Sequence, residues 1–216
     1  NERLQELAEK YDRIQKRLAD VNVVFVIDGS LGTQDHLAMV SATTDALVKK
    51  YKDKAPIAFS CVVYRNELSS IADASKDPLA NYCEKFGPTV SAAQFKERLG
   101  QVVPRNEGDK SDQRAVYFGL KQGIDLCQDD ETNILIHLGR SPDNSANPFF
   151  ESAKKTSGTR VEVSDLADLL KAGKGIHYLG YVTTAEGSKV PADDRNRLFE
   201  GLTEVMQNMA NTMSNW

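Results

Sequence analysis

The chain has 216 residues, of which 40% are hydrophobic and 27% are charged, and its formal net charge is -4. This composition is that of a globular α/β domain with a substantial core, and it excludes a disordered chain. A mildly acidic protein has no general attraction for nucleic acid or anionic lipid. No apolar run approaches the roughly 20 residues of a membrane-spanning helix. We therefore expect neither nucleic acid binding nor direct insertion of this segment into a membrane.

Residues 1–20 form the first predicted element, an amphipathic helix. Its apolar positions recur at spacings of three and four, with charged residues between them, and they are Leu4, Leu7, Tyr11, Ile14 and Leu18. The pattern matches a coiled-coil seam but lasts for fewer than three heptads, which is too short for a coiled coil by itself. We expect residues 1–20 either to pack on the domain or to tether it to an upstream segment, and residues 21–216 to form the domain.

Apolar strands and amphipathic helices alternate through the rest of the chain. The predicted strands are 23–27, 57–64, 134–138 and 176–182, with a short edge strand near 82–86. The predicted helices are 34–52, 91–103, 113–126, a helix with Ser164 as its N-cap that stops at Gly173, and 193–213. This order predicts a Rossmann-like, doubly wound, mostly parallel sheet with helices on both faces.

The three cysteines, Cys61, Cys83 and Cys127, have no CxxC spacing and cannot all pair with one another. We expect buried free thiols, which slightly favours the cytoplasm. One disulfide with one free thiol would also fit an exported domain, so a periplasmic location stays open for a membrane-anchored parent chain. The histidines His36, His137 and His177 are scattered, and we expect core or sheet positions for them rather than metal ligands.

The first strand ends in Asp28, Gly29 and Ser30. Ligands of open parallel sheets bind at the carboxyl ends of the strands. A carboxylate followed two residues later by a hydroxyl can place two oxygens on Mg²⁺, which prefers oxygen ligands. The end of the first strand is therefore the first candidate for a functional site.

This arrangement resembles the von Willebrand factor A (vWA) family. The metal-ion-dependent adhesion site of that family combines Asp-x-Ser-x-Ser after the first strand, a Thr or Asp in a middle loop, and Thr-Asp-Gly after the fourth strand. The order of elements from Val21 to the C-terminus is similar to the vWA fold throughout. The resemblance implies a protein-interaction module that is not an enzyme, whose partner is another protein.

Only part of the metal-site motif is kept. Asp28 and Ser30 match its first two ligands, whereas Gly32 has no side-chain oxygen at the third position. In the middle loop Ser111 is the counterpart of the family's ligand, with Asp112 or Asp109 as alternatives. The resemblance therefore implies a degenerate metal site made of Asp28, Ser30, Ser111 and Asp112.

Arg140 stands where the family has an aspartate after the fourth strand, because Thr-Asp becomes Gly139-Arg140. A guanidinium repels a divalent cation within a few ångströms. We therefore expect no cofactor, with bound Mg²⁺ as the alternative, and we hypothesise that Arg140 pairs with Asp28 in place of the cation.

The expected binding surface consists of the loops around this edge, with Gly32, Asp109, Arg140, Phe149 and Phe150. The two phenylalanines lie in a polar loop, where aromatic side chains can anchor a partner, although they could also begin a short helix and pack inward. Bacterial vWA modules are often attached to signalling or secretion proteins. By analogy alone, type VI secretion-associated kinases are one such setting.

An alternative comes from the string Asp28-Gly29-Ser30-Leu31-Gly32-Thr33, which resembles the Asp-x-Asp-Gly-Thr motif of haloacid dehalogenase-like phosphatases. Those Mg²⁺-dependent phosphohydrolases use the first aspartate as nucleophile and the second as acid and base. Asp28 would be the nucleophile here. Ser30 occupies the position of the second aspartate, which disfavours this alternative.

Overall fold

A five-stranded sheet with the order β3-β2-β1-β4-β5 forms the centre of the molecule. The computed structural model describes residues 2–30, 33–51, 56–65, 83–104, 114–143, 161–171, 175–182 and 192–214. The strands are β1 (Val21–Asp28), β2 (Ile57–Tyr64), β3 (Cys83–Thr89), β4 (Thr132–Gly139) and β5 (Ile176–Val182). All neighbours are parallel except β2 and β3. The predicted fold class is confirmed, and the expected edge strand is β3.

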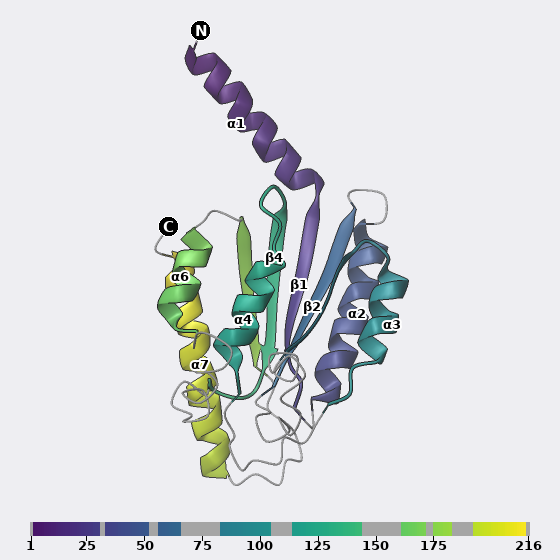
Figure 1. Ribbon diagram of the computed structural model, residues 1–216, viewed down its shortest axis with the longest axis vertical. Helices are drawn as coiled ribbons and strands as arrows, with labels where there is room; N and C mark the ends of the chain where they lie inside the picture. The colour runs from purple at the N-terminus through teal and green to yellow at the C-terminus, as the bar shows by residue number, and fades with distance from the viewer. Residues whose placement is uncertain are drawn as a thin grey trace, which may run out of the picture.

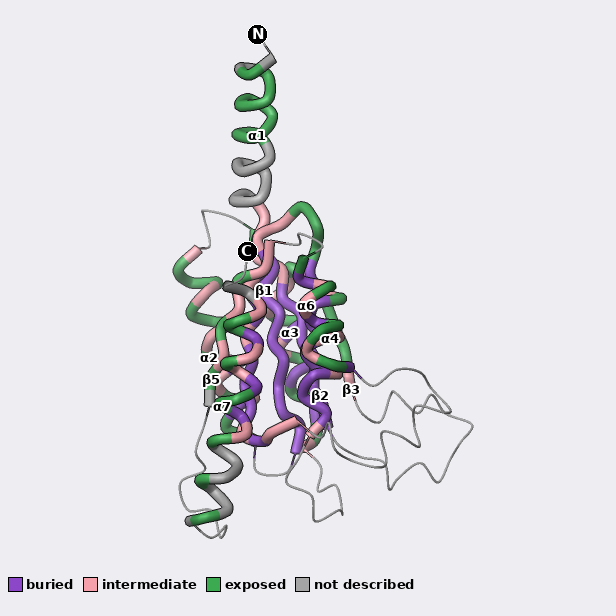
Figure 2. Tube along the Cα trace, turned by 90° about the vertical axis from the view of Figure 1, so that its left-hand side faces the viewer, coloured by how far each residue is buried: buried purple, intermediate pink, exposed green. Residues whose placement is uncertain are grey.

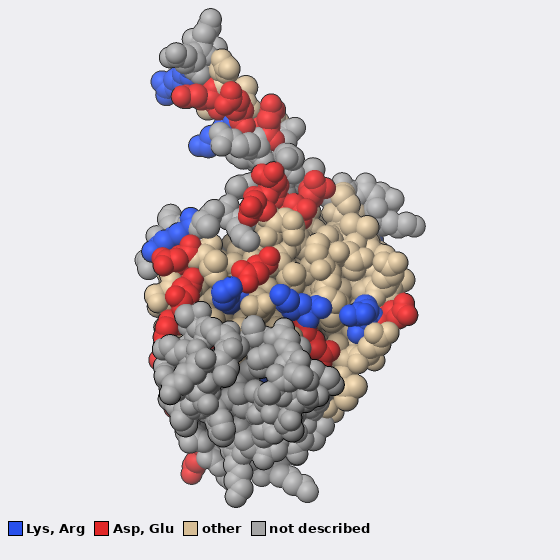
Figure 3. All heavy atoms as spheres, viewed as in Figure 1, with Lys and Arg blue, Asp and Glu red and all other residues tan. Residues whose placement is uncertain are grey.

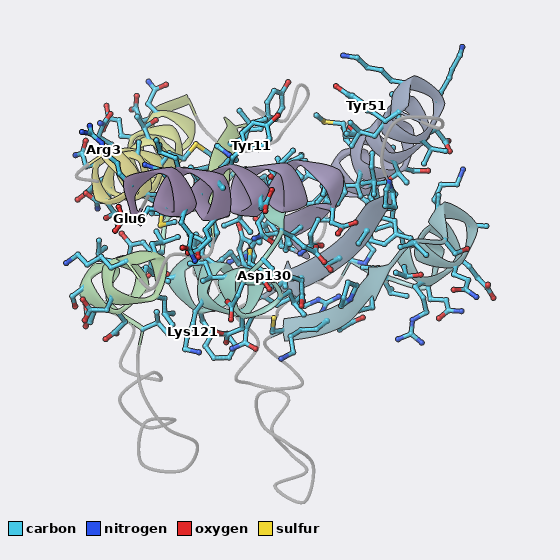
Figure 4. The ribbon with its side chains drawn as sticks, turned by 90° about the horizontal axis from the view of Figure 1, so that it is seen from above. Arg3, Glu6, Tyr11, Tyr51, Lys121 and Asp130 are labelled. Atoms are coloured by element: carbon cyan, nitrogen blue, oxygen red, sulfur yellow. The ribbon has the colours of Figure 1, made fainter. Side chains whose placement is uncertain are left out.

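Helices cover both faces of the sheet (Figure 1). On one face lie α2 (Gln34–Tyr51) and α3 (Ala92–Gly100), which pack against β1, β2 and β3. On the other lie α4 (Val116–Asp125), α6 (Val163–Lys171) and α7 (Ala192–Ser214). The view from above shows the two groups of helices on opposite sides of the strands (Figure 4). The doubly wound arrangement follows from the right-handed crossovers that connect parallel strands.

Strand β1 is buried on both faces, as its continuous apolar run predicts. Val24 and Val26 belong to the core under α4, α6 and α7, whereas Val23, Phe25 and Ile27 belong to the core under α2 and α3. Figure 2 shows this strand as a buried column through the middle of the domain. Because β1 is held by both cores, it fixes the position of the residues at its carboxyl end.

Helix α4 lies close to the sheet because two glycines face it. A Cβ atom at Gly123 would lie 2.5 Å from Cγ2 of Val26, and one at Gly119 would lie 2.7 Å from the ring of Tyr64. Both distances are shorter than van der Waals contact, so larger residues would push the helix outward. The small residues therefore set the spacing between α4 and the strands beneath it.

Helix α6 differs from the sequence prediction at its start. It begins at Val163, so Ser164 lies within its first turn and is not the N-cap. The backbone N–H of Glu162 donates to Oδ2 of Asp165 at 2.7 Å. A carboxylate in the first turn thus takes the stabilising role that we had expected of the serine hydroxyl. The predicted stop at Gly173 lies outside the described residues.

The cysteines are free thiols, as expected. Cys61 and Cys127 are buried, and Cys83 is partly buried on the edge strand. Burial raises the pKa of the Cys83 thiol to about 12 and that of Cys61 well above its usual value. Raised pKa values keep these thiols protonated, so they behave as apolar core groups.

Helix α1 (Glu2–Ala19) projects away from the body at the end where β1 begins (Figure 1). Asp20 alone separates it from β1, and its apolar residues Leu7 and Tyr11 are 56% and 60% exposed. Acidic and basic side chains lie on the described part of its surface, and acidic ones also gather where it joins the body (Figure 3). Among the described residues, no helix is long and apolar enough to cross a membrane.

A buried asparagine pair ties the strands together at the opposite end of the sheet from Asp28. Nδ2 of Asn22 donates to Oδ1 of Asn133 at 3.1 Å and to the carbonyl of Leu126. Asn133 also accepts from the N–H of Gln128 at 2.9 Å and donates to its carbonyl at 2.7 Å. The pair therefore joins β1 to β4 and fixes the turn that follows α4.

The substitution Asn133→Ala removes the hydrogen bond from Nδ2 of Asn22 and both bonds to the backbone of Gln128. We expect a loss of about 3 kcal/mol in the free energy of unfolding, since each of these hydrogen bonds contributes about 1 kcal/mol. Urea denaturation followed by circular dichroism measures the loss. Gln128→Ala is the matched control, because its exposed side chain makes one local hydrogen bond and should cost under about 0.5 kcal/mol. Equal effects of the two substitutions would contradict a structural role for the pair.

Candidate functional site at the carboxyl edge of the sheet

Asp28 is the last residue of β1, the central strand, and its side chain is fully buried. Its Oδ1 accepts the backbone N–H of Ser30 at 2.9 Å. Its Oδ2 and the Oγ of Ser30 are both buried and have no hydrogen-bond partner among the described residues. Burying polar atoms without partners costs free energy, so two such oxygens within three residues mark this edge as the functional candidate.

The turn after β1 is held by backbone contacts. The N–H of Gly29 donates to the carbonyl of Tyr64 at 2.8 Å, which extends the pairing of β1 with β2 past the strand end. A Cβ at Gly29 would lie 2.5 Å from Cγ1 of Val63, so this close approach requires glycine. Thr33 then donates through Oγ1 to the carbonyl of Ser30 at 2.7 Å and leads into α2. These contacts fix where Asp28 and Ser30 lie.

Two buried histidines lie within the electrostatic reach of Asp28. Burial lowers the pKa of His36, an effect that the Asp28 carboxylate opposes and the Arg140 guanidinium reinforces. Burial likewise lowers the pKa of His137 to about 4, with Asp28 opposing and His36 adding to the effect. Both imidazoles are therefore neutral at neutral pH, and they do not balance the charge of Asp28.

A chain of hydrogen bonds runs behind Asp28 across β2, β4 and β5. The hydroxyl of Tyr64 lies 3.1 Å from Nε2 of His137, and the hydroxyl of Tyr178 lies 3.0 Å from its Nδ1. Burial raises the pKa of both tyrosines, so their hydroxyls stay protonated. A Cβ at Gly139 would lie 2.5 Å from the Tyr64 hydroxyl, so the absence of a side chain at this position makes room for the hydrogen-bonded chain. Sequence reasoning placed His137 in the sheet but missed both tyrosines.

Arg140 does not form the ion pair that we hypothesised from the sequence. Oδ2 of Asp28 has no partner among the described residues, and Oδ1 is bonded to the Ser30 N–H. Arg140 follows the end of β4 and is partly exposed, whereas Asp28 is fully enclosed. Its influence on the pKa of His36 nevertheless places positive charge in the same neighbourhood. The hypothesis of a direct Arg140 to Asp28 contact is therefore wrong for this structure.

Asp143 is a site residue that the sequence analysis missed. Its Oδ1 accepts the N–H of Tyr117 at 2.9 Å and thereby caps the start of α4. The N–H of Arg114 donates to the carbonyl of Pro142 at 2.9 Å, which ties the same two segments together. One indication of this contact was present in the sequence. Ala115 is the N-cap residue of α4 and has no side-chain acceptor, so the first turn of the helix needs an acceptor from another segment. Asp143 joins the segment after β4 to the segment before α4.

Arg65, which follows β2, is among the largest fully buried side chains of the described residues. Its guanidinium pairs with Glu84 of β3 at 2.7 Å and donates to the carbonyl of Val103 at 3.2 Å. These contacts hold the edge strand and the end of α3 against the carboxyl end of β2. Arg65 is thus committed to internal contacts, and we assign it a structural role at the site.

The described residues bring Asp28 and Ser30 together and place Arg140 near them. No group of three or more His, Cys, Asp or Glu that could hold a metal occurs among the residues that the structure describes. The other predicted positions lie outside the described residues, and they are Gly32, Asp109, Ser111, Asp112, Phe149 and Phe150.

The sequence of the chain matches a known protein family. The family described as "TssR protein VWA domain" matches residues 7–160. This chain belongs to that family. Membership confirms the vWA-type fold and supports the expected association with a secretion system. No curated protein matches the chain.

Two solved structures are similar to the chain at low sequence identity. Proximal thread matrix protein 1 from the mussel byssus is 17% identical, with a TM-score of 0.42 over 84% of this chain and 41% of its own. The pilus adhesin SpaC from Lactobacillus rhamnosus GG, in an open conformation, is 12% identical, with a TM-score of 0.48 over 86% of this chain and 26% of its own. The chain thus spans less than half the length of either protein.

The low pKa of His137 predicts a loss of stability in acid. The unfolded chain binds a proton near pH 6.5, whereas the folded chain binds it only near pH 4. The free energy of unfolding should therefore fall by roughly 3 kcal/mol from this group as the pH drops through that window. Urea denaturation at several pH values measures the fall.

His137→Gln keeps hydrogen-bonding capacity without the titration and should flatten this pH dependence. His177→Gln is the control, because His177 lies exposed on β5 and its replacement should leave the profile unchanged. A profile that is the same in wild type and His137→Gln would show that the buried imidazole is not its source.

Proposed function

We propose that this TssR-type vWA domain is a non-enzymatic protein-interaction module with an impaired metal site, and that it recognises another protein at the carboxyl edge of its sheet. One observation carries the proposal. Asp28 and Ser30 present two buried oxygens without described partners, while Arg140 stands where the family's motif has an acidic ligand. The recognition edge of a vWA domain is thus retained, and the charge that would hold its cation is reduced.

In this proposal the site keeps two ligands of a Mg²⁺ site, Asp28 and Ser30. Mg²⁺ takes octahedral oxygen coordination with at least one or two carboxylates, and the motif residues in the described part of the chain supply Asp28 and Ser30 alone. Replacing one carboxylate by a guanidinium makes the local charge about two units more positive, which disfavours binding of a divalent cation. Gly32 removes a further oxygen. Ser111 and Asp112 remain the proposed further ligands, so any metal affinity should be weak.

The partner surface that we propose surrounds this edge and includes Gly32, Asp109, Arg140, Phe149 and Phe150. Arg140 supplies a guanidinium, a group enriched at the centres of protein interfaces, and the two phenylalanines supply apolar anchors. Membership in the TssR family makes a protein of the type VI secretion machinery the proposed class of partner. A phosphohydrolase that uses Asp28 gains no support, because Ser30 cannot act as the second acid.

Calorimetric titration of the chelator-treated domain with Mg²⁺ and Mn²⁺ tests the impaired metal site. We expect no micromolar binding by the unmodified domain and a gain of at least about tenfold in affinity for Arg140→Asp, which restores a carboxylate and removes a positive charge. Lys96→Asp makes the same charge change on α3, away from this edge, and should gain nothing. Micromolar binding by the unmodified domain would overturn the proposal of an impaired site.

Site-directed photo-crosslinking in cells that contain the secretion apparatus tests the partner surface. A photoreactive amino acid at position 140 should give a defined protein adduct that persists when divalent cations are chelated, because the contact does not depend on a bound metal. The same label at position 96 on α3 should not give this adduct. Equal labelling from both positions, or loss of the adduct on chelation, would contradict recognition at an impaired metal site.

A further inference from the structure

The two edge strands of the sheet differ in how well they are protected against further pairing. At one edge, β3 carries Glu84, Lys85 and Pro88 and has a register irregularity against β2. Charges, proline and bulges are the features by which natural edge strands avoid pairing with other strands. At the other edge, β5 reads Ile-His-Tyr-Leu-Gly-Tyr-Val and has none of these features. Among the described residues no strand pairs with its outer side.

One face of β5 also carries exposed apolar side chains. Leu179 is 58% exposed and Tyr181 is 48% exposed, on the side of the sheet where α2 and α3 lie. Those helices pack on β1, β2 and β3, whereas β5 lies at the opposite edge of the sheet. Ile136 of β4, which lies beside Leu179, is itself only partly buried. An apolar patch therefore adjoins an unprotected strand edge, which is unusual for an isolated domain.

We propose that β5 pairs in antiparallel orientation with β5 of a second copy, so that two five-stranded sheets become one continuous sheet across a twofold axis. The register that pairs all seven residues of Ile176–Val182 is centred on Leu179. It places Leu179 opposite its own copy and His177 opposite Tyr181 of the second copy. Aliphatic and aromatic cross-strand pairs of this kind stabilise antiparallel sheets. Twofold pairing of this type uses the same surface on both copies.

The charge distribution favours a second copy as the occupant. No charged residue occurs in Ile176–Val182, so antiparallel self-pairing places no like charges opposite one another. Self-pairing of β3 would instead bring Glu84 and Lys85 into the contact. Helix α7 packs on the opposite face of β5, with Met206 against Gly180, and carries no charged residue from Val205 to Ser214. Charged residues make up 27% of the whole chain but are absent from β5 and from this part of α7, so this surface is suited to self-association.

The pairing is independent of the proposed function. It uses the outer side of β5, whereas the proposed partner surface lies at the carboxyl ends of β1 and β4. A stable interface needs about 1,200–2,000 Å² of buried surface, more than one strand pair supplies. The flanking surface of α7 is therefore part of the contact, and we expect a dissociation constant on the order of 10 μM.

Sedimentation velocity of the whole chain from 1 to 200 μM tests the pairing. We expect a shift from monomer to dimer over this range, and Leu179→Lys should weaken it by at least about tenfold, because it places two cations opposite each other at the twofold axis. Leu179 is more than half exposed, so the substitution should leave the circular dichroism spectrum unchanged. Val90→Lys, at a position that is 73% exposed beyond the other edge strand, is the matched control and should dimerise like wild type.

Hydrogen exchange distinguishes pairing through β5 from association through another surface, such as α1. Amide protection in β5 should rise with protein concentration in wild type and Val90→Lys but not in Leu179→Lys. A chain that stays monomeric at 200 μM would overturn the proposal. So would a dimer that Leu179→Lys leaves intact, or one whose protection rises outside β5 and α7. Neither result bears on binding at the carboxyl edge, which the crosslinking at position 140 tests separately.

Discussion

The burial of β1 on both faces is the constraint on which the rest of the structure depends. Its alternating side chains supply both cores, so the strand cannot shift by one residue without exchanging the two apolar faces. Asp28 ends this strand and is consequently fixed in a fully buried position. The glycine that follows continues the pairing with β2 and turns the chain toward Ser30. The position of the candidate site is thus a consequence of core packing.

The electrostatics of the site follow from the same burial. An enclosed carboxylate is costly unless it is paired, hydrogen-bonded or near positive charge. One oxygen of Asp28 receives a backbone N–H, and the surrounding imidazoles are neutral because burial lowers their pKa values. Beneath the site, the imidazole of His137 lies within hydrogen-bonding distance of the hydroxyls of Tyr64 and Tyr178. The guanidinium of Arg140 adds positive charge to this neighbourhood, where it lowers the pKa of His36.

The site and the open edge of β5 lie on different parts of one sheet. The carboxyl ends of the strands carry the residues that resemble a vWA recognition site, whereas the side of β5 carries an apolar, uncharged strand. The proposed partner surface and the proposed pairing edge are therefore separate, so one domain can use both at once. Two linked sites that each bind weakly together bind more tightly, because binding at one site raises the effective concentration at the other.

The sequence by itself determined the α/β class, the order of the strands and helices, and the candidate residues Asp28 and Ser30, because local periodicity and motif spacing are properties of short segments. It did not determine that Arg140 leaves Asp28 unpaired, that Asp143 caps α4, or that Tyr64 and Tyr178 join through His137. Those contacts link residues far apart in the chain, and their geometry depends on strand register and helix approach. The same holds for β5. Its sequence predicts a strand, and only the tertiary structure, in which Leu179 and Tyr181 are exposed and no described strand pairs with its outer side, decided that it is an open edge.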